Sequence, residues 1–231
     1  MIKMNVLKLN SLEKTYSQST VSVHALRGIT LEINAGEFTA IVGPSGSGKT
    51  TLLNIIGGLD KASSGTVWIN GIDIDSLKDN ELIDFRLNNI GFVFQSYNLM
   101  PVLSAKENVE FIMQLQGVSN EERSKKAEAI LISVGLEDKI NARPKELSGG
   151  QQQRVAVARA LASKPKFVLA DEPTANLDSV STKGLLDIMF KMNQEEGMTF
   201  IFSTHDQRVI DRAKRVITIE DGKVVSDENR I

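Results

Sequence analysis

One eight-residue segment, GPSGSGKT, constrains this chain more than any other part of its sequence. It fits the pattern G-x-x-x-x-G-K-[ST], in which glycines let backbone N–H groups approach phosphate oxygens. The apolar run 38–43 precedes the segment, and Leu52, Ile55, Ile56 and Leu59 follow it at helical spacing. This order predicts a strand, a tight loop and a helix whose dipole favours an anion at the loop. We therefore predict a nucleotide-phosphate site formed by Gly43, Pro44, Ser45, Gly46, Ser47, Gly48, Lys49, Thr50 and Thr51.

Two side chains of this loop have specific expected roles. Lys49 would neutralise charge on the β and γ phosphates, and the hydroxyl of Thr50 would bind Mg²⁺. The alternative is a flexible surface loop without a ligand. The strand before the loop and the helix after it favour the nucleotide.

Composition limits the classes of partner. The 231 residues suit one large domain or a domain with an inserted subdomain, and 41% hydrophobic residues supply ample material for a core. A net charge of -2 gives no basic footprint, so we expect no nucleic-acid partner. The absence of cysteine excludes disulfides, thiolate catalysis and cysteine-ligated zinc. No apolar run approaches the roughly 20 residues that span a bilayer, so any membrane role must work through a partner.

Apolar patterning predicts an α/β fold. The alternating segments 6–9, 29–33 and 66–71 are typical of half-buried strands. More continuous apolar runs at 166–172 and 199–205 indicate buried strands that end in polar residues, where ligands bind in open α/β sheets.

The other segments complete this pattern. Residues 76–163 look mostly helical, with a helix that starts near Ser119 or Asn120 and stops at Gly135. Residues 215–227 carry an Asp-Gly turn between alternating runs, which predicts a hairpin.

Three polar side chains follow the buried strands directly. Asp171 suits Mg²⁺, which prefers hard oxygen ligands, and Glu172 could polarise an attacking water as a general base. His205 could hydrogen-bond a γ phosphate and hold the water against Glu172. The alternatives are an ordinary acidic loop and an ordinary surface histidine. Proximity to the phosphate loop favours the catalytic interpretation.

A second stretch, ELSGGQQQRVAVARA at 146–160, has features of an anion-binding helix start. Ser148 is a good N-cap, and Gly149 and Gly150 bare the backbone there. Val155, Ala158 and Ala162 would mark the buried side of the helix. Taken alone, the stretch favours a capped helix with no ligand. Beside the phosphate loop it suggests two half-sites that must be brought together.

These motifs together resemble the ATP-binding cassette (ABC) ATPases, over essentially the whole chain. LSGGQ at 147–151 resembles the family signature, and Asp171-Glu172 follows the strand that the family calls Walker B. Further matches are Tyr16 at the adenine-stacking position, Gln95 in the Q-loop, Asn176-Leu177-Asp178 in the D-loop and His205 in the H-loop.

The resemblance implies a fold and its parts. It implies a P-loop NTPase (RecA-like) α/β core with an N-terminal antiparallel β subdomain and an inserted α-helical subdomain. Residues 1–231 would form one ABC ATPase domain, in which 1–95 and 164–231 make the β subdomain and core. Residues 96–163 would form the helical subdomain.

The resemblance also implies a shared site that takes ATP and Mg²⁺. Two cassettes would pair head to tail, so that each ATP lies between one chain's phosphate loop and the other's LSGGQ. Thr50, Gln95 and Asp171 would arrange Mg²⁺, Glu172 would activate water, and His205 and Gln95 would assist. The residues that would complete nucleotide binding are Tyr16, Ser148, Gly149, Gly150, Gln151 and Asp178.

A membrane partner follows from the same resemblance. A groove lined from residues 94–109 would receive a helix of an integral membrane permease, although Phe94, Tyr97, Leu99 and Met100 could simply be core. We expect the permease to be a separate chain and this protein to be cytoplasmic, peripheral on the cytoplasmic face of the membrane.

The sequence is similar to the LolD/MacB-like group of lipoprotein-release, macrolide and peptide exporter ATPases, which favours export or extraction. The alternative is a non-transport ABC ATPase, such as a cluster-assembly or cell-division ATPase. Cargo is chosen by the permease.

Overall fold

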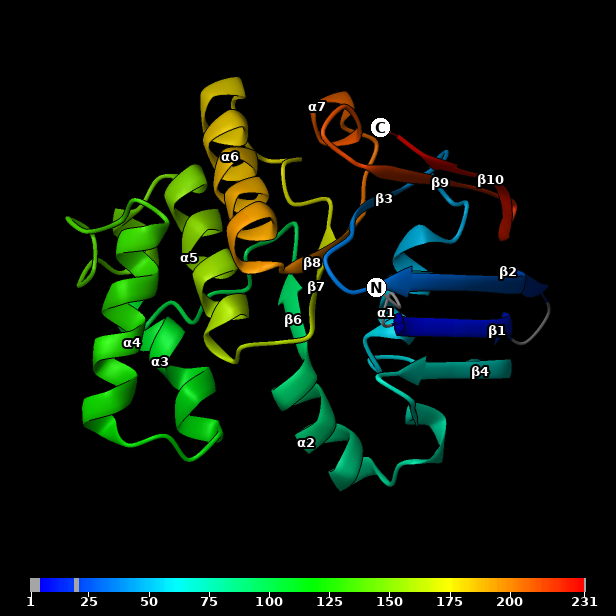
Figure 1. The fold of residues 1–231 in the computed structure, drawn as a ribbon, viewed down its shortest axis with the longest axis horizontal. Helices are drawn as coiled ribbons and strands as arrows, with labels where there is room; N and C mark the ends of the chain where they lie inside the picture. The colour runs from blue at the N-terminus through cyan, green and yellow to red at the C-terminus, as the bar shows by residue number, and fades with distance from the viewer. Residues whose placement is uncertain (1–4, 19–20, 231) are drawn as a thin grey trace.

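A computed structural model describes residues 5–18 and 21–230 of the chain. An antiparallel sheet lies at one side, helices α3, α4 and α5 lie at the other, and a mixed sheet lies between them (Figure 1). Both sheets and the helices contribute to two large hydrophobic clusters.

The N-terminal sheet is antiparallel, as the family resemblance implies, and the alternating segments lie in its strands. Its strand order is β2-β1-β4-β5. The first two strands are 14 residues each and pair from Asn5↔Asn34 to Gln18↔Val21, with register shifts along the way. The strands are β1 (Asn5–Gln18), β2 (Val21–Asn34), β4 (Ser64–Ile69) and β5 (Ile72–Asp73).

The central sheet has six strands in the order β10-β9-β3-β8-β7-β6. Its inner strands are parallel, and only β10 pairs in the antiparallel sense, as one arm of the predicted hairpin at Asp221-Gly222. Parallel strands present their carboxyl ends at one edge, where ligands bind in such sheets. The strands are β3 (Phe38–Val42), β6 (Ile90–Val93), β7 (Phe167–Asp171), β8 (Thr199–Ser203), β9 (Arg215–Glu220) and β10 (Lys223–Asn229).

Helix ends follow the capping signals. Ser119 accepts a hydrogen bond from the N–H of Glu122 at the start of α4, and Gly135 has a φ of 71° just beyond its end, as predicted. The helices are α1 (Lys49–Ile56), α2 (Asp79–Asn89), α3 (Ala105–Leu115), α4 (Asn120–Ser133), α5 (Gly149–Ala162), α6 (Ser179–Glu196) and α7 (Gln207–Ile210), with short 3-10 turns at Ile74–Ser76 and Pro144–Glu146.

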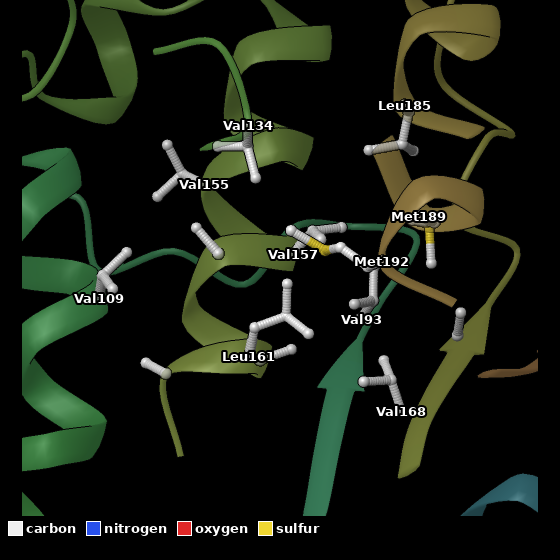
Figure 2. Packing of buried hydrophobic residues seen from close by; sticks show 14 of the residues in the cluster. Val93, Val109, Val134, Val155, Val157, Leu161, Val168, Leu185, Met189 and Met192 are labelled. Atoms are coloured by element: carbon white, nitrogen blue, oxygen red, sulfur yellow. The ribbon is translucent and has the colours of Figure 1, made fainter. Parts of the chain in front are cut away.

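Helix α5 lies inside the core rather than on its surface. Figure 2 shows it between α3, α6 and the strands β6 and β7, with Val155, Val157 and Leu161 among the packed side chains. Each such buried aliphatic side chain contributes about 1.5–3 kcal/mol of transfer free energy. The buried part of α5 therefore fixes the position of the N-terminus of this helix.

The structure confirms the predicted fold class and corrects three local expectations. Helix α1 ends at Ile56, so Leu59 is not helical, because Gly57 and Gly58 follow. Strand β6 lies within the segment expected to be mostly helical. Val155, Ala158 and Ala162 are buried as predicted, but Ala156, Val157, Ala160 and Leu161 are buried too, so the buried surface of α5 is wider than one side.

The proposed division at 95/96 and 163/164 stays a prediction, and its outer limits, residues 1 and 231, lie outside the described residues. None of the described helices is both long enough and apolar enough to cross a membrane.

Candidate functional site

The phosphate loop joins the end of β3 to the start of α1. A Cβ at Gly43, whose φ is 149°, would lie 2.0 Å from the carbonyl oxygen of Ile219, so only glycine fits there. Lys49 is 9% exposed, and its Nζ donates to the carbonyls of Gly43 at 2.8 Å and Pro44 at 3.0 Å. The ammonium is thus held against its own loop, beside the N-terminus of α1.

The carboxyl ends of β7 and β8 bring the predicted acidic and histidine side chains together. Nδ1 of His205 lies 2.7 Å from Oε1 of Glu172. A carboxylate can only accept, so this nitrogen carries the proton and leaves Nε2 for other partners. Thr204 Oγ1 donates to the other oxygen of Glu172 at 3.2 Å. Glu172 itself has a φ of 45°, and its N–H donates to the carbonyl of Ser203 at 2.8 Å.

Asp171 connects this cluster to the phosphate loop. Thr50 Oγ1 donates to Asp171 Oδ1 at 3.3 Å. A hydroxyl and a carboxylate are hard oxygen donors of the kind Mg²⁺ prefers, so this pair fits the ion. The described residues contain no group of three His, Cys, Asp or Glu side chains placed to hold a metal, so any ion would need phosphate and water oxygens as well.

A cleft of about 1010 Å³ opens over the loop and the strand ends. Tyr16, Gln95, Glu172 and His205 line it together with most of the phosphate loop. The cleft therefore unites residues from the first strand to position 222. Its other lining residues are Ser22, Val23, His24, Ala25, Arg27, Ala175, Asp221 and Gly222.

The signature stretch lies outside this cleft. Ser148 caps α5 by accepting from the N–H of Gln151 at 3.3 Å, and Gln151 Oε1 accepts from the N–H of Ser148 at 2.9 Å. A Cβ on Gly150 would meet Ser181 Oγ at 2.6 Å. Asp178 also lies outside the cleft, where it caps α6 by accepting from the backbone of Val180 and Ser181.

The segment around Gln95 is held by side chains from other elements. Gln153 Nε2 donates to the carbonyl of Phe94 at 3.4 Å, and Asn176 Nδ2 donates to the carbonyl of Gln95 at 3.0 Å. Arg159 donates to the carbonyls of Tyr97, at 2.9 Å, and of Asn98. We name residues 94–98 the cleft–groove loop, since Gln95 lines the cleft and Phe94 and Asn98 line a second hollow.

That second hollow is a mainly apolar groove of about 420 Å³. Of the four side chains predicted to face a partner, Phe94 lines it, whereas Tyr97, Leu99 and Met100 do not. Leu99 packs against the core instead, as the alternative interpretation has it. The remaining lining comes from α2, β6, α3, α5, the cleft–groove loop and the residue after α5: Ile83, Arg86, Leu87, Ile90, Gly91, Phe92, Asn98, Ile112, Arg159, Ala160 and Ser163.

Sequence reasoning missed the residues behind Glu172. Asp206 accepts from Thr174 Oγ1 at 2.7 Å and from the guanidinium of Arg208, and its N–H donates to Thr204 Oγ1 at 3.0 Å. The Arg208 hydrogen bonds lower the pKa of Asp206 to about 2, against the opposing effect of burial. The signal was present, because Thr204 and Asp206 also follow β8 directly.

A parallel sheet with a glycine-rich loop leading into a helix, and carboxylates at the neighbouring strand end, defines a P-loop nucleotide hydrolase. The model of the ABC transporter family matches residues 26–175. The chain belongs to this family, and it is an ABC ATPase that takes ATP and Mg²⁺.

Two relatives and one solved structure illustrate the similarity. The chain is 47% identical to the uncharacterized ABC transporter ATP-binding protein MJ0796 of Methanocaldococcus jannaschii, over 96% of this chain and 97% of the relative. It is 45% identical to the macrolide export ATP-binding/permease protein MacB of Brucella melitensis, over 97% of this chain but 35% of that relative. A dimeric structure of the cassette MJ0796 bound to ADP and Pi matches with a TM-score of 0.90 and 45% identity, covering 96% of this chain and 98% of that one.

Proposed function

We propose that this ATPase is a transporter subunit that pairs with a second copy on ATP and drives a membrane permease. The observation that carries the proposal is the separation between the cleft and the signature. The chain supplies most of the phosphate loop and the carboxylate of Glu172 in one cleft, while Ser148–Gln151 caps a helix outside it. Dimeric structures of a cassette 45% identical to this chain support the pairing.

Within one cleft, the residues divide the chemistry. Tyr16 stacks on adenine, and Lys49 with the loop N–H groups neutralises the phosphates. Thr50, Asp171 and Gln95 would hold Mg²⁺, which supplies further charge neutralisation when bound. Glu172 accepts the proton of the attacking water.

His205 keeps Glu172 in place through its Nδ1–H, and in the doubly protonated imidazolium form it also donates from Nε2–H to the γ phosphate. Phosphate never becomes attached to the protein, since catalysis consists of positioning and charge stabilisation.

The partner's signature completes the cleft. The N-terminus of α5 carries a partial positive charge, and the N–H groups of Gly149 and Gly150 belong to its first turn. Facing a γ phosphate across an interface, these N–H groups and the side chains of Ser148 and Gln151 clamp the anion, while the carboxylate of Asp178 stays on the cap of α6. ATP thus holds the dimer together, and loss of the γ phosphate releases it.

The apolar groove receives a permease helix. It is lined by the exposed Ile83 and the partly buried Phe92 and Phe94, so an amphipathic helix with apolar side chains at i, i+3 and i+4 fits it. The fused permease of the MacB relatives supports export or extraction, with the chain on the cytoplasmic face of the membrane. A failure to capture any integral membrane protein would favour the alternative, a non-transport ABC ATPase.

A complementation experiment tests the shared site. Lys49→Ala removes the phosphate loop cation, and Ser148→Arg places a bulky cation at the signature, so each variant alone should lose hydrolysis. Mixed, they form heterodimers in which one of the two sites has an intact loop and an intact signature. Random pairing gives about a quarter of the wild-type number of intact sites.

Hydrolysis that returns on mixing, in proportion to the heterodimer seen by sizing chromatography, is the expected result. No recovery, with heterodimers present, would contradict a site built from two chains. A mixture of Lys49→Ala with Lys49→Met is the matched control and should stay inactive.

A further inference from the structure

Tyr16, a residue of the cleft wall, is fixed by two charged side chains that lie outside the cleft. Its Oη donates to Asp60 Oδ2 at 2.7 Å. Lys14 Nζ donates to the other oxygen of Asp60 at 2.7 Å and lies 4.7 Å from the centroid of the Tyr16 ring. A ring that is 39% exposed needs no such anchoring for stability alone.

These hydrogen bonds fix the position of the Tyr16 ring relative to the phosphate loop. Asp60 lies just beyond α1, the helix that starts at Lys49, and its N–H donates to the carbonyl of Asn54 within α1. Lys14 also donates to the carbonyl of Lys61 at 2.7 Å. Strand β1 and the end of α1 are thereby joined by three short hydrogen bonds, so the ring and the loop keep a fixed separation.

Lys14 covers one face of the Tyr16 ring. Its Nζ lies over the ring, and Tyr16 lines the cleft whereas Lys14 and Asp60 do not. A cation on one face draws π-electron density toward itself and leaves the other face better suited to an electron-rich base. Burial and the bond to Asp60 both raise the pKa of Tyr16, which keeps its hydroxyl a donor.

We propose that Asp60 and Lys14 are positioning residues that hold the Tyr16 ring as a base platform, so that they set how much of the nucleotide affinity comes from the base. The inference rests on the proposed stacking role of Tyr16. It predicts that loss of either charged side chain weakens binding of a purine nucleotide and spares binding of its phosphates.

The test compares Mg²⁺-ADP with Mg²⁺-pyrophosphate by titration calorimetry, because neither is hydrolysed. Asp60→Asn and Lys14→Met should each weaken ADP binding about tenfold, the worth of one hydrogen bond to a charged group, and change pyrophosphate binding by less than about twofold. Tyr16→Phe keeps the ring but loses the hydroxyl, so adding Asp60→Asn to it should cost less than Asp60→Asn costs alone.

Lys8→Met and Glu32→Gln are matched controls. Lys8 and Glu32 form an ion pair at 2.8 Å on β1 and β2, away from the cleft lining, and their variants should bind both ligands as the wild type does. Thermal unfolding without ligand verifies that all variants are folded.

Three outcomes would contradict the inference or the stacking role of Tyr16 on which it rests. Equal losses for ADP and pyrophosphate would show that Asp60 and Lys14 merely support the fold, and would overturn the inference. Unchanged ADP binding in both charged-residue variants, with a loss in Tyr16→Ala, would overturn the inference and keep the stacking role. Unchanged ADP binding in Tyr16→Ala would overturn the stacking role itself.

Discussion

Arg159, on α5, holds the cleft–groove loop (residues 94–98) by hydrogen bonds. Its loss should leave the loop free to move relative to the helix that carries the signature. Its guanidinium donates to the carbonyls of Tyr97 and Asn98, whose φ values are 60° and 50°. That region costs a non-glycine residue about 1 kcal/mol or more. Arg159→Met keeps the apolar stem but removes both bonds, so the loop is expected to relax out of this conformation.

The burial of these two hydrogen bonds determines the expected loss of stability. A net hydrogen bond to a charged group is worth about 1.5–3 kcal/mol when it is buried. The bond to Tyr97 is partly buried, whereas the bond to Asn98 is exposed and can be replaced by water. We therefore expect Arg159→Met to lower the free energy of unfolding by about 2 kcal/mol, dominated by the Tyr97 carbonyl. Arg159→Lys can keep one bond and should lose about half as much.

The fall in kcat of Arg159→Met should be larger than its loss of stability alone would cause. Displacing Gln95 by about 1 Å is enough to lower kcat by tenfold or more. The assay is urea unfolding together with kcat for ATP at a temperature where every variant is folded. Arg154→Met is the control, because Arg154 also lies on α5 but donates to the carbonyl of Val134, far from the loop in the sequence. Wild-type kcat in folded Arg159→Met, beside a stability loss, would refute the coupling and leave Arg159 a structural residue.

Three further predictions follow from the site. Glu172→Gln should bind ATP, hydrolyse it at least about a hundredfold more slowly and accumulate as a dimer on a sizing column, since it loses the general base; unchanged turnover would remove Glu172 from that role. The Arg208 bonds that lower the pKa of Asp206 from 3.8 to about 2 contribute about 2 kcal/mol to stability, present above pH 4 and lost as the pH falls toward 2. Thermal unfolding should therefore show a deficit in Asp206→Asn at pH 7 that shrinks by pH 2, and a deficit independent of pH would contradict this linkage. Gly43→Ala should abolish ATP binding, because the added Cβ meets a backbone oxygen. Gly46→Ala has nothing within 4 Å of its Cβ and should keep the apo fold, with a strain of about 1–2 kcal/mol. Equal stability of the two variants without nucleotide would contradict the steric argument.

The features that sequence alone predicts are local in the chain. The phosphate loop is set by eight consecutive residues, and the caps at Ser119 and Ser148 depend on groups within three residues. Apolar runs locate the strands because burial on both faces leaves no polar positions. The carboxyl-end rule then brings Asp171, Glu172 and His205 to one edge of the sheet.

The interactions that sequence could not predict join distant residues through ordinary side chains. Tyr16 and Asp60 are 44 positions apart, and Arg159 reaches carbonyls 61 and 62 positions away. A carbonyl acceptor leaves no trace in the sequence, because every residue carries one. The same limit explains why α5 looked one-sided: Ala156 and Ala160 are small enough to face either core or solvent, and only the packing decides.

The hydrogen bonds to residues 94–98 restrict how this loop can move relative to α5. Gln153 and Arg159 belong to α5, the helix whose first turn is the signature, and both hold carbonyls of the cleft–groove loop. Because most residues of α5 from Val155 to Ala162 are buried in the core, the helix cannot bend to accommodate a shifted loop without opening the core. A permease helix that displaces Phe94 in the groove must therefore move α5 as a unit, and with it the anion clamp at Ser148, or break the bonds to Gln153 and Arg159. If the permease helix proposed above occupies the groove and these bonds hold, then occupancy of the groove and movement of Ser148 are linked as one motion.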